Sequence, residues 1–196
     1  MTERARRSPL AVVLLALLAE EPMHPYRMQQ LIKERGKDRI ANVAARNSVY
    51  QAIERLVRLG LIEAGETERD ERRPERTSYA LTAEGRRTLH EWLRDMLASP
   101  AREFPEFPAA LANMAVLEAD EVLACLRDRR AALLAAIDEA EADVASAPGL
   151  PRLFLLETEY QITVIRAELR WVESLVDDLA AGTIAWRWDQ LTEEFG

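Results

Sequence analysis

The sequence predicts a mainly α-helical protein with one small two-stranded sheet. Only 7 of its 196 residues are glycine, whereas Ala, Leu, Glu and Arg, which favour helix, are abundant. Apolar residues recur at helical spacing along most of the chain, and they change to strand-like alternation only between residues 61 and 82. Hydrophobic residues make up 48% of the chain, which is enough to bury a core.

A linker predicts two domains. Residues 99–108 contain three prolines and two phenylalanines, so we expect one domain over residues 1–98 and a helical domain over residues 99–196. Residues 1–99 contain 18 Lys and Arg against 15 Asp and Glu, and residues 100–196 contain 8 against 19. This asymmetry is typical of a basic binding module joined to an acidic assembly or sensor module. Chance variation in an acidic helical protein is the alternative.

The N-terminal apolar run, residues 10–19, follows Arg4, Arg6 and Arg7 and resembles the start of a signal peptide. No small-x-small cleavage site follows it, and it is half of the roughly 20 residues that a membrane span needs. We therefore expect a buried helix and a cytoplasmic protein without a membrane partner. The single Cys125 excludes an internal disulfide, and its apolar neighbours predict a buried structural thiol.

Two further helices are expected before residue 61. Residues 26–35 follow Pro25, which suits the first position of a helix, and end at Gly36. Residues 45–60 have an apolar face and a polar face, and the polar face consists of Asn47, Gln51, Arg55 and Arg58. Asn and Gln can bind adenine through two hydrogen bonds, and Arg can bind guanine in the same way. The pattern indicates a DNA-recognition helix; an ordinary surface helix is the alternative.

Two strands and a fourth helix follow. Residues 61–68 and 77–82 flank a polar loop, residues 69–76, and the second segment alternates as a half-buried strand does. Thr82 is placed to cap a helix over residues 83–98. Three helices followed by a two-stranded wing predict a winged helix-turn-helix.

Three segments extend this prediction: HPYRMQQLI (residues 24–32), SVYQAIERLVRLGLIE (48–63) and RTSYALTAEG (76–85). In this order and at this spacing, they resemble the PadR family of bacterial transcriptional regulators, over about residues 8–98. The resemblance implies a dimeric repressor with a helical C-terminal dimerisation region, often responsive to a small molecule. It also implies that Tyr26, Ser48 and Tyr50 lie near DNA phosphates and that Arg76 enters the second wing strand.

The expected DNA-binding residues come from helices and wing together. They are Tyr26, Asn47, Ser48, Tyr50, Gln51, Arg55, Arg72, Arg73 and Arg76. The wing, residues 61–82, contains four arginines but six acidic residues, whereas the family wing is usually more basic. An alternative therefore stays open: a dimeric winged-helix adaptor that binds proteins and not DNA.

The C-terminal half predicts helices over residues 109–117, 120–146 and 153–181. The last helix has a first stripe at coiled-coil spacing, which we expect to form the dimer interface: Ile162, Ile165, Leu169, Val172, Val176 and Leu179. It also has a second stripe on another face: Leu153, Leu156, Tyr160, Val164, Trp171 and Leu175. Two long helices cannot easily cover both stripes, which favours a homodimer and, by symmetry, a palindromic operator. Packing of both stripes within one chain is the alternative.

Aromatic residues suggest a ligand site. Trp92, Trp171, Phe104 and Phe107 could line a pocket for a small aromatic effector, although each residue by itself is more typical of core or interface packing. Neither His24 nor His90 has the spacing of a metal ligand, and no glycine-rich phosphate loop, cysteine pair or nucleophile elbow occurs. We therefore expect no enzymatic activity, no catalytic residue, no metal and no cofactor.

Overall fold

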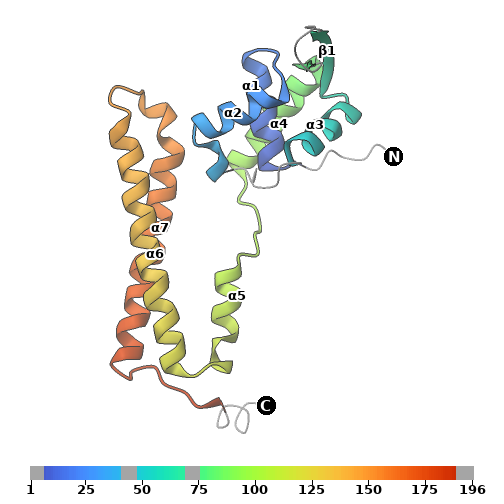
Figure 1. The fold of residues 1–196 in the computed structure, drawn as a ribbon. Coiled ribbons are helices and arrows are strands. Elements are labelled where there is room, and N and C mark those ends of the chain that lie inside the picture. Colours follow the sequence, from blue (N-terminus) through green and yellow to red (C-terminus); the bar gives the residue numbers. More distant parts are fainter. Residues whose placement is uncertain (1–6, 41–47, 69–75, 189–196) are drawn as a thin grey trace. The chain divides into compact units, whose positions relative to one another are not determined.

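The protein consists of two compact units, residues 1–102 and residues 103–196. The computed structural model describes residues 7–40, 48–68 and 76–188 (Figure 1). It is mainly helical with a two-stranded antiparallel sheet, which confirms the fold class predicted from the sequence. None of the helices in these ranges is long and apolar enough to cross a membrane.

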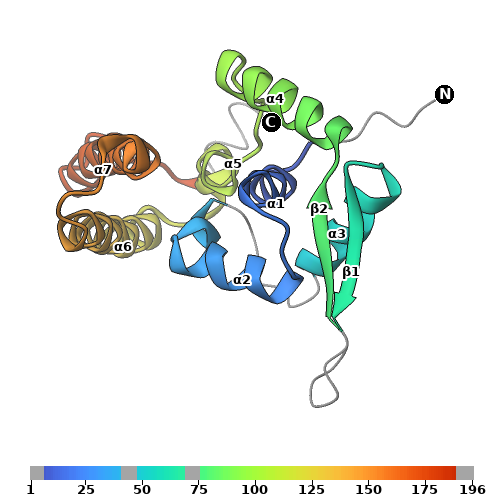
Figure 2. The same cartoon turned by 90° about the horizontal axis from the view of Figure 1, so that it is seen from above.

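The N-terminal unit is built around its first helix, α1 (Pro9–Glu20). Ser8 caps this helix, because its Oγ accepts a hydrogen bond from the Ala11 N–H at 3.2 Å. The side chains of α1 are buried on several sides, and Leu14 and Leu15 are fully buried. Seen from above, α1 lies among α2 (Pro25–Glu34), α4 (Ala83–Ala98) and β2 (Arg76–Leu81) (Figure 2). The apolar N-terminal run is therefore a core helix, as predicted.

The second and third helices form the helix-turn-helix. A short 3₁₀ helix, η1 (Lys37–Arg39), follows α2, and α3 (Ser48–Arg58) begins after residues 41–47. Val49, Ile53 and Leu56 attach α3 to the core, since each is at most 2% exposed. After α3 the chain turns at Gly60, whose φ of 67° favours glycine. Helix α3 is described from Ser48, three residues later than the start predicted from the sequence.

The wing is a hairpin of β1 (Ile62–Glu68) and β2 (Arg76–Leu81), with its loop outside the described residues. Ile62 pairs with Leu81 and Ala64 with Tyr79, and the register is irregular between Ala64 and Thr67. Met23 adds an isolated bridge, since its N–H donates to the Tyr79 carbonyl at 3.1 Å and its carbonyl accepts from the Tyr79 N–H at 3.0 Å. The turn before α2 is thus attached to the wing.

The wing joins α4 through a close contact at Gly85. Thr82 caps α4, because its Oγ1 accepts a hydrogen bond from the Gly85 N–H at 2.9 Å and lies 2.8 Å from the Gly60 carbonyl oxygen, to which it can donate. A Cβ atom on residue 85 would lie 1.9 Å from the Leu61 carbonyl oxygen. Only glycine fits here, so this position fixes the packing of the wing on α4.

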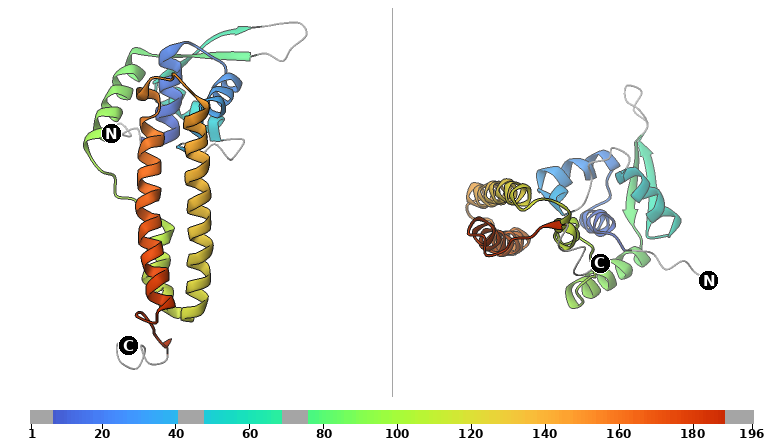
Figure 3. Two further views of the ribbon diagram at one scale, coloured as in Figure 1. Left: turned by 90° about the vertical axis from the view of Figure 1, so that its left-hand side faces the viewer. Right: turned by 90° about the horizontal axis from the view of Figure 1, so that it is seen from below.

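The C-terminal unit is a helical hairpin with one shorter helix beside it (Figure 3). Its elements are α5 (Glu106–Asn113), η2 (Met114–Val116), α6 (Ala119–Ser146), η3 (Arg152–Phe154) and α7 (Leu156–Ala180). Helices α6 and α7 pack along their length around Val122, Leu126, Val172, Leu175 and Leu179. Arg130, which interrupts the apolar stripe of α6, donates from Nε to Glu173 Oε1 at 3.0 Å.

Burial within one chain bears on one expectation for this unit and contradicts another. Most of the first stripe of α7 is already covered within one chain: Ile162, Leu169, Val172 and Leu179 are buried, and Ile165 and Val176 are half-buried. This stripe is therefore the contact between α7 and α6, and it offers little surface to a second copy. Cys125, expected to be buried, is exposed, because it lies on the side of α6 that α7 does not cover.

Candidate nucleic-acid interface

The outer face of α3 presents polar side chains on a rigid support. Tyr50, Gln51, Glu54 and Arg58 are exposed, whereas the opposite side of the helix is buried in the core. Tyr50 is 48% exposed, so its ring and its phenol are available for contact with a partner. A helix of this kind can enter the major groove with its polar face toward the base edges.

Arg55 lies at the edge of this face and not at its centre. It is half-buried, and it borders a small cavity of about 20 Å³ with Ser8 and Trp92. Ser48, at the first position of α3, is also half-buried. The centre of the exposed face is therefore made by Gln51 and Arg58.

The start of α2 contributes a second exposed phenol. Tyr26 follows Pro25 at the beginning of the helix and is 64% exposed. Because the bridge between Met23 and Tyr79 fixes the preceding turn, the position of this ring is tied to the wing. Tyr26 and Tyr50 are thus presented from the two helices of the helix-turn-helix.

Some of the arginines near this surface are neutralised by carboxylates. Arg35 donates to both oxygens of Glu20, from Nη1 at 2.5 Å and from Nη2 at 2.9 Å, and this connects the ends of α1 and α2. The hydrogen bonds from Arg35 hold the pKa of the Glu20 carboxyl below its ordinary value. Arg27 lies 3.3 Å from Glu34. Because these two arginines are paired with carboxylates, they are less available to bind DNA phosphates.

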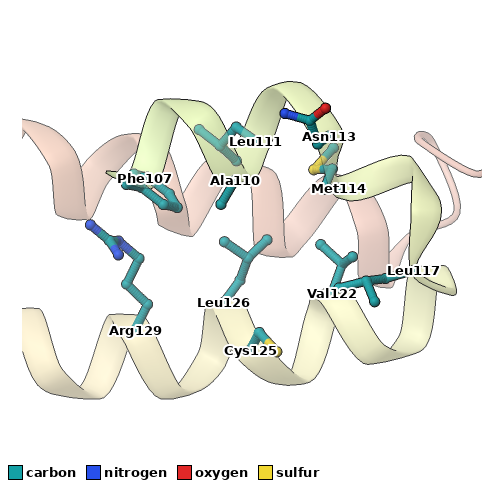
Figure 4. A pocket seen from close by; sticks show the side chains of 10 residues that line it. All are labelled: Phe107, Ala110, Leu111, Asn113, Met114, Leu117, Val122, Cys125, Leu126 and Arg129. Atoms are coloured by element: carbon teal, nitrogen blue, oxygen red, sulfur yellow. The ribbon is translucent and has the colours of Figure 1, made fainter. Parts of the chain in front are cut away.

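The C-terminal unit has a cavity of about 430 Å³ (Figure 4). It lies between α5 with η2 on one side and α6 on the other, and it is lined by Phe107, Ala110, Leu111, Asn113, Met114, Leu117, Val122, Cys125, Leu126 and Arg129. Two of the aromatic residues expected in an effector pocket meet here. The ring of Phe107 lines the cavity and packs edge-to-face on Trp171, with centroids 6.1 Å apart.

The other two predicted aromatic residues are not part of this cavity. Trp92 is buried in the core of the N-terminal unit, and Phe104 is 83% exposed. The expected four-residue pocket is therefore corrected to a cavity with one aromatic wall. Cys125 and Arg129 complete it, and the sequence patterns did not associate them with a ligand. No group of residues in the described ranges has the composition and proximity of a metal site.

Residues 14–91, which contain α2, α3, the wing and the start of α4, match the model of the transcriptional regulator PadR-like family. The match supports a DNA-binding transcriptional regulator whose winged helix-turn-helix lies in these residues. No curated protein matches the chain.

Solved structures share the fold of this chain at low sequence identity. PadR from Bacillus subtilis in complex with operator DNA has a TM-score of 0.67 at 20% identity, over 87% of this chain and 98% of that one. PadR from the same organism in complex with p-coumaric acid has a TM-score of 0.68 at 18% identity, over 88% and 99%. The virulence activator AphA of Vibrio cholerae has a TM-score of 0.68 at 19% identity, over 88% and 98%.

Several residues expected at a PadR-like interface cannot be located. Asn47, Arg72 and Arg73 lie outside the described residues. Arg76 is the first residue of β2, opposite Glu68 in the register of the wing. The described part of the candidate interface therefore consists of Tyr26 on α2 and the outer face of α3.

Glu54 is a residue of this face that the sequence analysis missed. It is exposed between Gln51 and Arg58, three and four residues away, on the same side of α3. The helical spacing of Glu54 already contained this signal. A carboxylate can accept a hydrogen bond from the cytosine amino group, and it repels phosphates. Glu54 is thus a candidate for discriminating between bases.

Proposed function

We propose that this PadR-like regulator is a homodimeric repressor that binds a palindromic operator and is released by a small molecule. The observation that supports it best is the exposed polar face of α3, since a buried apolar side holds this helix rigidly. Gln51 and Arg55, with Asn47 and Arg58, would contact bases. Tyr26, Ser48 and Tyr50 would position α3 on phosphates, helped by Arg72, Arg73 and Arg76. The similarity to PadR bound to operator DNA supports this use of the fold.

We assign the dimer interface to the second stripe, which begins at Leu153 in η3 and continues along α7. Tyr160 is 70% exposed, Trp171 49% and Leu153 72%, although all three are large and apolar or aromatic. Leu156 and Val164 are exposed beside them, whereas Leu175 is buried in the chain itself. Exposed apolar groups gathered on one helix favour association. A two-fold dimer would present two α3 helices to two half-sites of a palindrome.

The proposal also includes repression as the direction of regulation and a small aromatic molecule as the effector. Repression is implied by the resemblance to PadR, whereas AphA, which has the same fold, is an activator. Release by a small aromatic molecule is supported by the PadR complex with p-coumaric acid, and by a cavity of suitable size in this chain.

Fluorescence anisotropy on a duplex from the protein's own upstream region, over a series of salt concentrations, tests operator binding. We expect tight binding that is stronger than to scrambled DNA and falls steeply with salt, because phosphate contacts release counterions. Gln51→Ala and Arg58→Ala should each weaken operator binding by roughly 1–3 kcal/mol. Arg127→Ala, which removes an exposed charge from α6 in the other unit, is the matched control and should change it little.

The adaptor alternative is favoured by the acidic wing and makes the opposite prediction. An adaptor would bind neither duplex at low salt, and Gln51→Ala would have nothing to weaken. Size-exclusion chromatography with light scattering should still give a dimer in that case. The two functions are therefore separated by DNA binding and not by oligomeric state.

A further inference from the structure

The cavity between α5 and α6 has the construction of a small-molecule site (Figure 4). Its volume of about 430 Å³ falls within the range of roughly 300–1,000 Å³ that is usual for such sites. Val122 and Leu126 of α6 lie on one side of it and are at most 5% exposed. Leu111 of α5 lies opposite, and Met114 and Leu117 come from η2 and the residue after it.

The polar groups of this cavity are already engaged within the chain. Arg129 is the only charged residue among those that line it. Its Nε donates to Glu168 Oε1 at 2.7 Å, and its guanidinium carbon lies 3.5 Å from the centroid of the Phe107 ring. The amide nitrogen of Asn113 donates to the Ala109 carbonyl at 2.7 Å. An anionic ligand would have to compete with Glu168 for the only cation present.

We propose that this cavity binds a small, uncharged, predominantly apolar molecule. Phe107, whose ring contacts Arg129 and Trp171, closes one end of the cavity, and a planar ring would pack between Leu111 and Leu126. Such a ligand contacts α5 and α6 at once and stabilises their packing, since binding to the folded unit alone raises its stability. If the protein is the proposed regulator, this cavity is the site of its effector. Binding of the ligand can be measured whether or not the protein is a repressor.

The size of the cavity argues against a larger occupant. A helix is about 10 Å wide and rises about 5.4 Å per turn, so a volume of this kind holds roughly one turn. Only one turn of a helix from a second copy would fit in the cavity, and the rest of that helix would lie outside. A molecule of one or two rings fits in the cavity entirely. The other possible occupants are a second copy and residues 189–196 of the chain itself.

Cys125 provides a direct measurement, because it lines the cavity, is exposed, and is the only cysteine in the chain. The rate of its alkylation by iodoacetamide would be measured on the full-length protein without DNA. The probes are neutral N-phenyl-1-naphthylamine and anionic 8-anilinonaphthalene-1-sulfonate. At ten times its dissociation constant, the neutral probe should slow alkylation about tenfold, as expected from the unoccupied fraction. The sulfonate should bind more weakly and protect less.

Three variants sharpen the test. Ala110→Trp, which fills the cavity, should abolish protection by the neutral probe, whereas Ala109→Trp, on the neighbouring exposed position of α5 outside the cavity, should not. Glu168→Gln removes the charge that neutralises Arg129 and should shift the preference toward the sulfonate. Circular dichroism would confirm that each variant is as helical as the parent protein.

Each contrary outcome overturns a defined part of the proposal. If Cys125 is unreactive without any probe, a second copy or residues 189–196 cover the cavity, and a variant truncated after residue 188 distinguishes these occupants. If a probe binds but does not protect Cys125, the ligand site lies elsewhere. If both probes protect equally, the uncharged ligand class is wrong. None of these results depends on operator binding, so failure of the proposed repressor function remains distinguishable.

Discussion

The two units of this protein differ in how completely one chain covers their apolar surface. In the N-terminal unit, α1 and its neighbours bury a continuous core in which the largest side chains, such as Leu14 and Ile32, are fully buried. In the C-terminal unit, α6 and α7 bury one stripe between them but leave Tyr160, Leu153 and Trp171 exposed. The first unit has the properties of a self-sufficient domain, whereas the second has those of an assembly surface.

The largest effect should come from breaking the closest contact of the N-terminal unit. Gly85→Ala places a Cβ atom against the Leu61 carbonyl oxygen, so the backbone of the wing or of α4 must shift. We expect a loss of about 3 kcal/mol or more in the free energy of unfolding. Denaturant unfolding would measure it, with Arg86→Ala, at an exposed neighbouring position, as a control that changes stability by less than about 0.5 kcal/mol.

The second prediction separates the two stripes of α7. Leu169→Ala removes a buried side chain from the contact with α6 and should cost about 2–4 kcal/mol of stability. Tyr160→Asp puts a charge into the exposed stripe and should instead convert the dimer to a monomer, with little change in helicity. Light scattering and thermal unfolding would be measured for both. If Leu169→Ala instead dissociates the dimer without lowering the thermal stability, the dimer interface is the first stripe.

The third prediction concerns base discrimination by α3. Glu54→Gln keeps the shape of the side chain but removes its negative charge. This charge repels phosphates and strengthens a hydrogen bond from the cytosine amino group. We expect affinity for scrambled DNA to rise and the ratio of operator to scrambled binding to fall, by roughly 1–3 kcal/mol in discrimination. Glu63→Gln, at an exposed position of β1, is the matched control. A uniform gain on both duplexes would show that Glu54 acts only through its charge.

The smallest effect should be the pH dependence of the ion pair at the ends of α1 and α2. Arg35 lowers the pKa of Glu20 in the folded protein, so the pair stabilises it above the ordinary carboxyl value of about 4.5. This contribution is lost as the pH falls through the lower folded pKa. Because both side chains are largely exposed, Glu20→Gln should cost at most about 0.5 kcal/mol at neutral pH.

The matching pair in the C-terminal unit provides the control for this measurement. Arg152 lowers the pKa of Glu159 in the same way, but the Arg152 side chain is 78% exposed, compared with 42% for Arg35. Glu159→Gln should therefore leave thermal stability unchanged between pH 3 and 7. An equal loss in both variants would show that the position of the Glu20 pair between two helices does not matter.

The sequence by itself determined the local structure, because local structure follows from periodicity and from capping residues. Thr82 and the spacing of the apolar residues fixed α4 at Ala83–Ala98, and alternation located the second strand to within one residue. The helical pattern also distinguished the buried and exposed sides of α3. Each of these features depends on neighbours that are close in the chain.

Only the tertiary structure decided which partner covers each face. The pattern of α7 showed two apolar stripes but could not show which of them α6 would cover, because periodicity defines a face and not its neighbour. For the same reason, the sequence placed Cys125 in the core, whereas it lines an open cavity between α5 and α6. The cavity and the pairing of Arg129 with Glu168 join residues that lie far apart in the chain, so they exist only once the helices have packed.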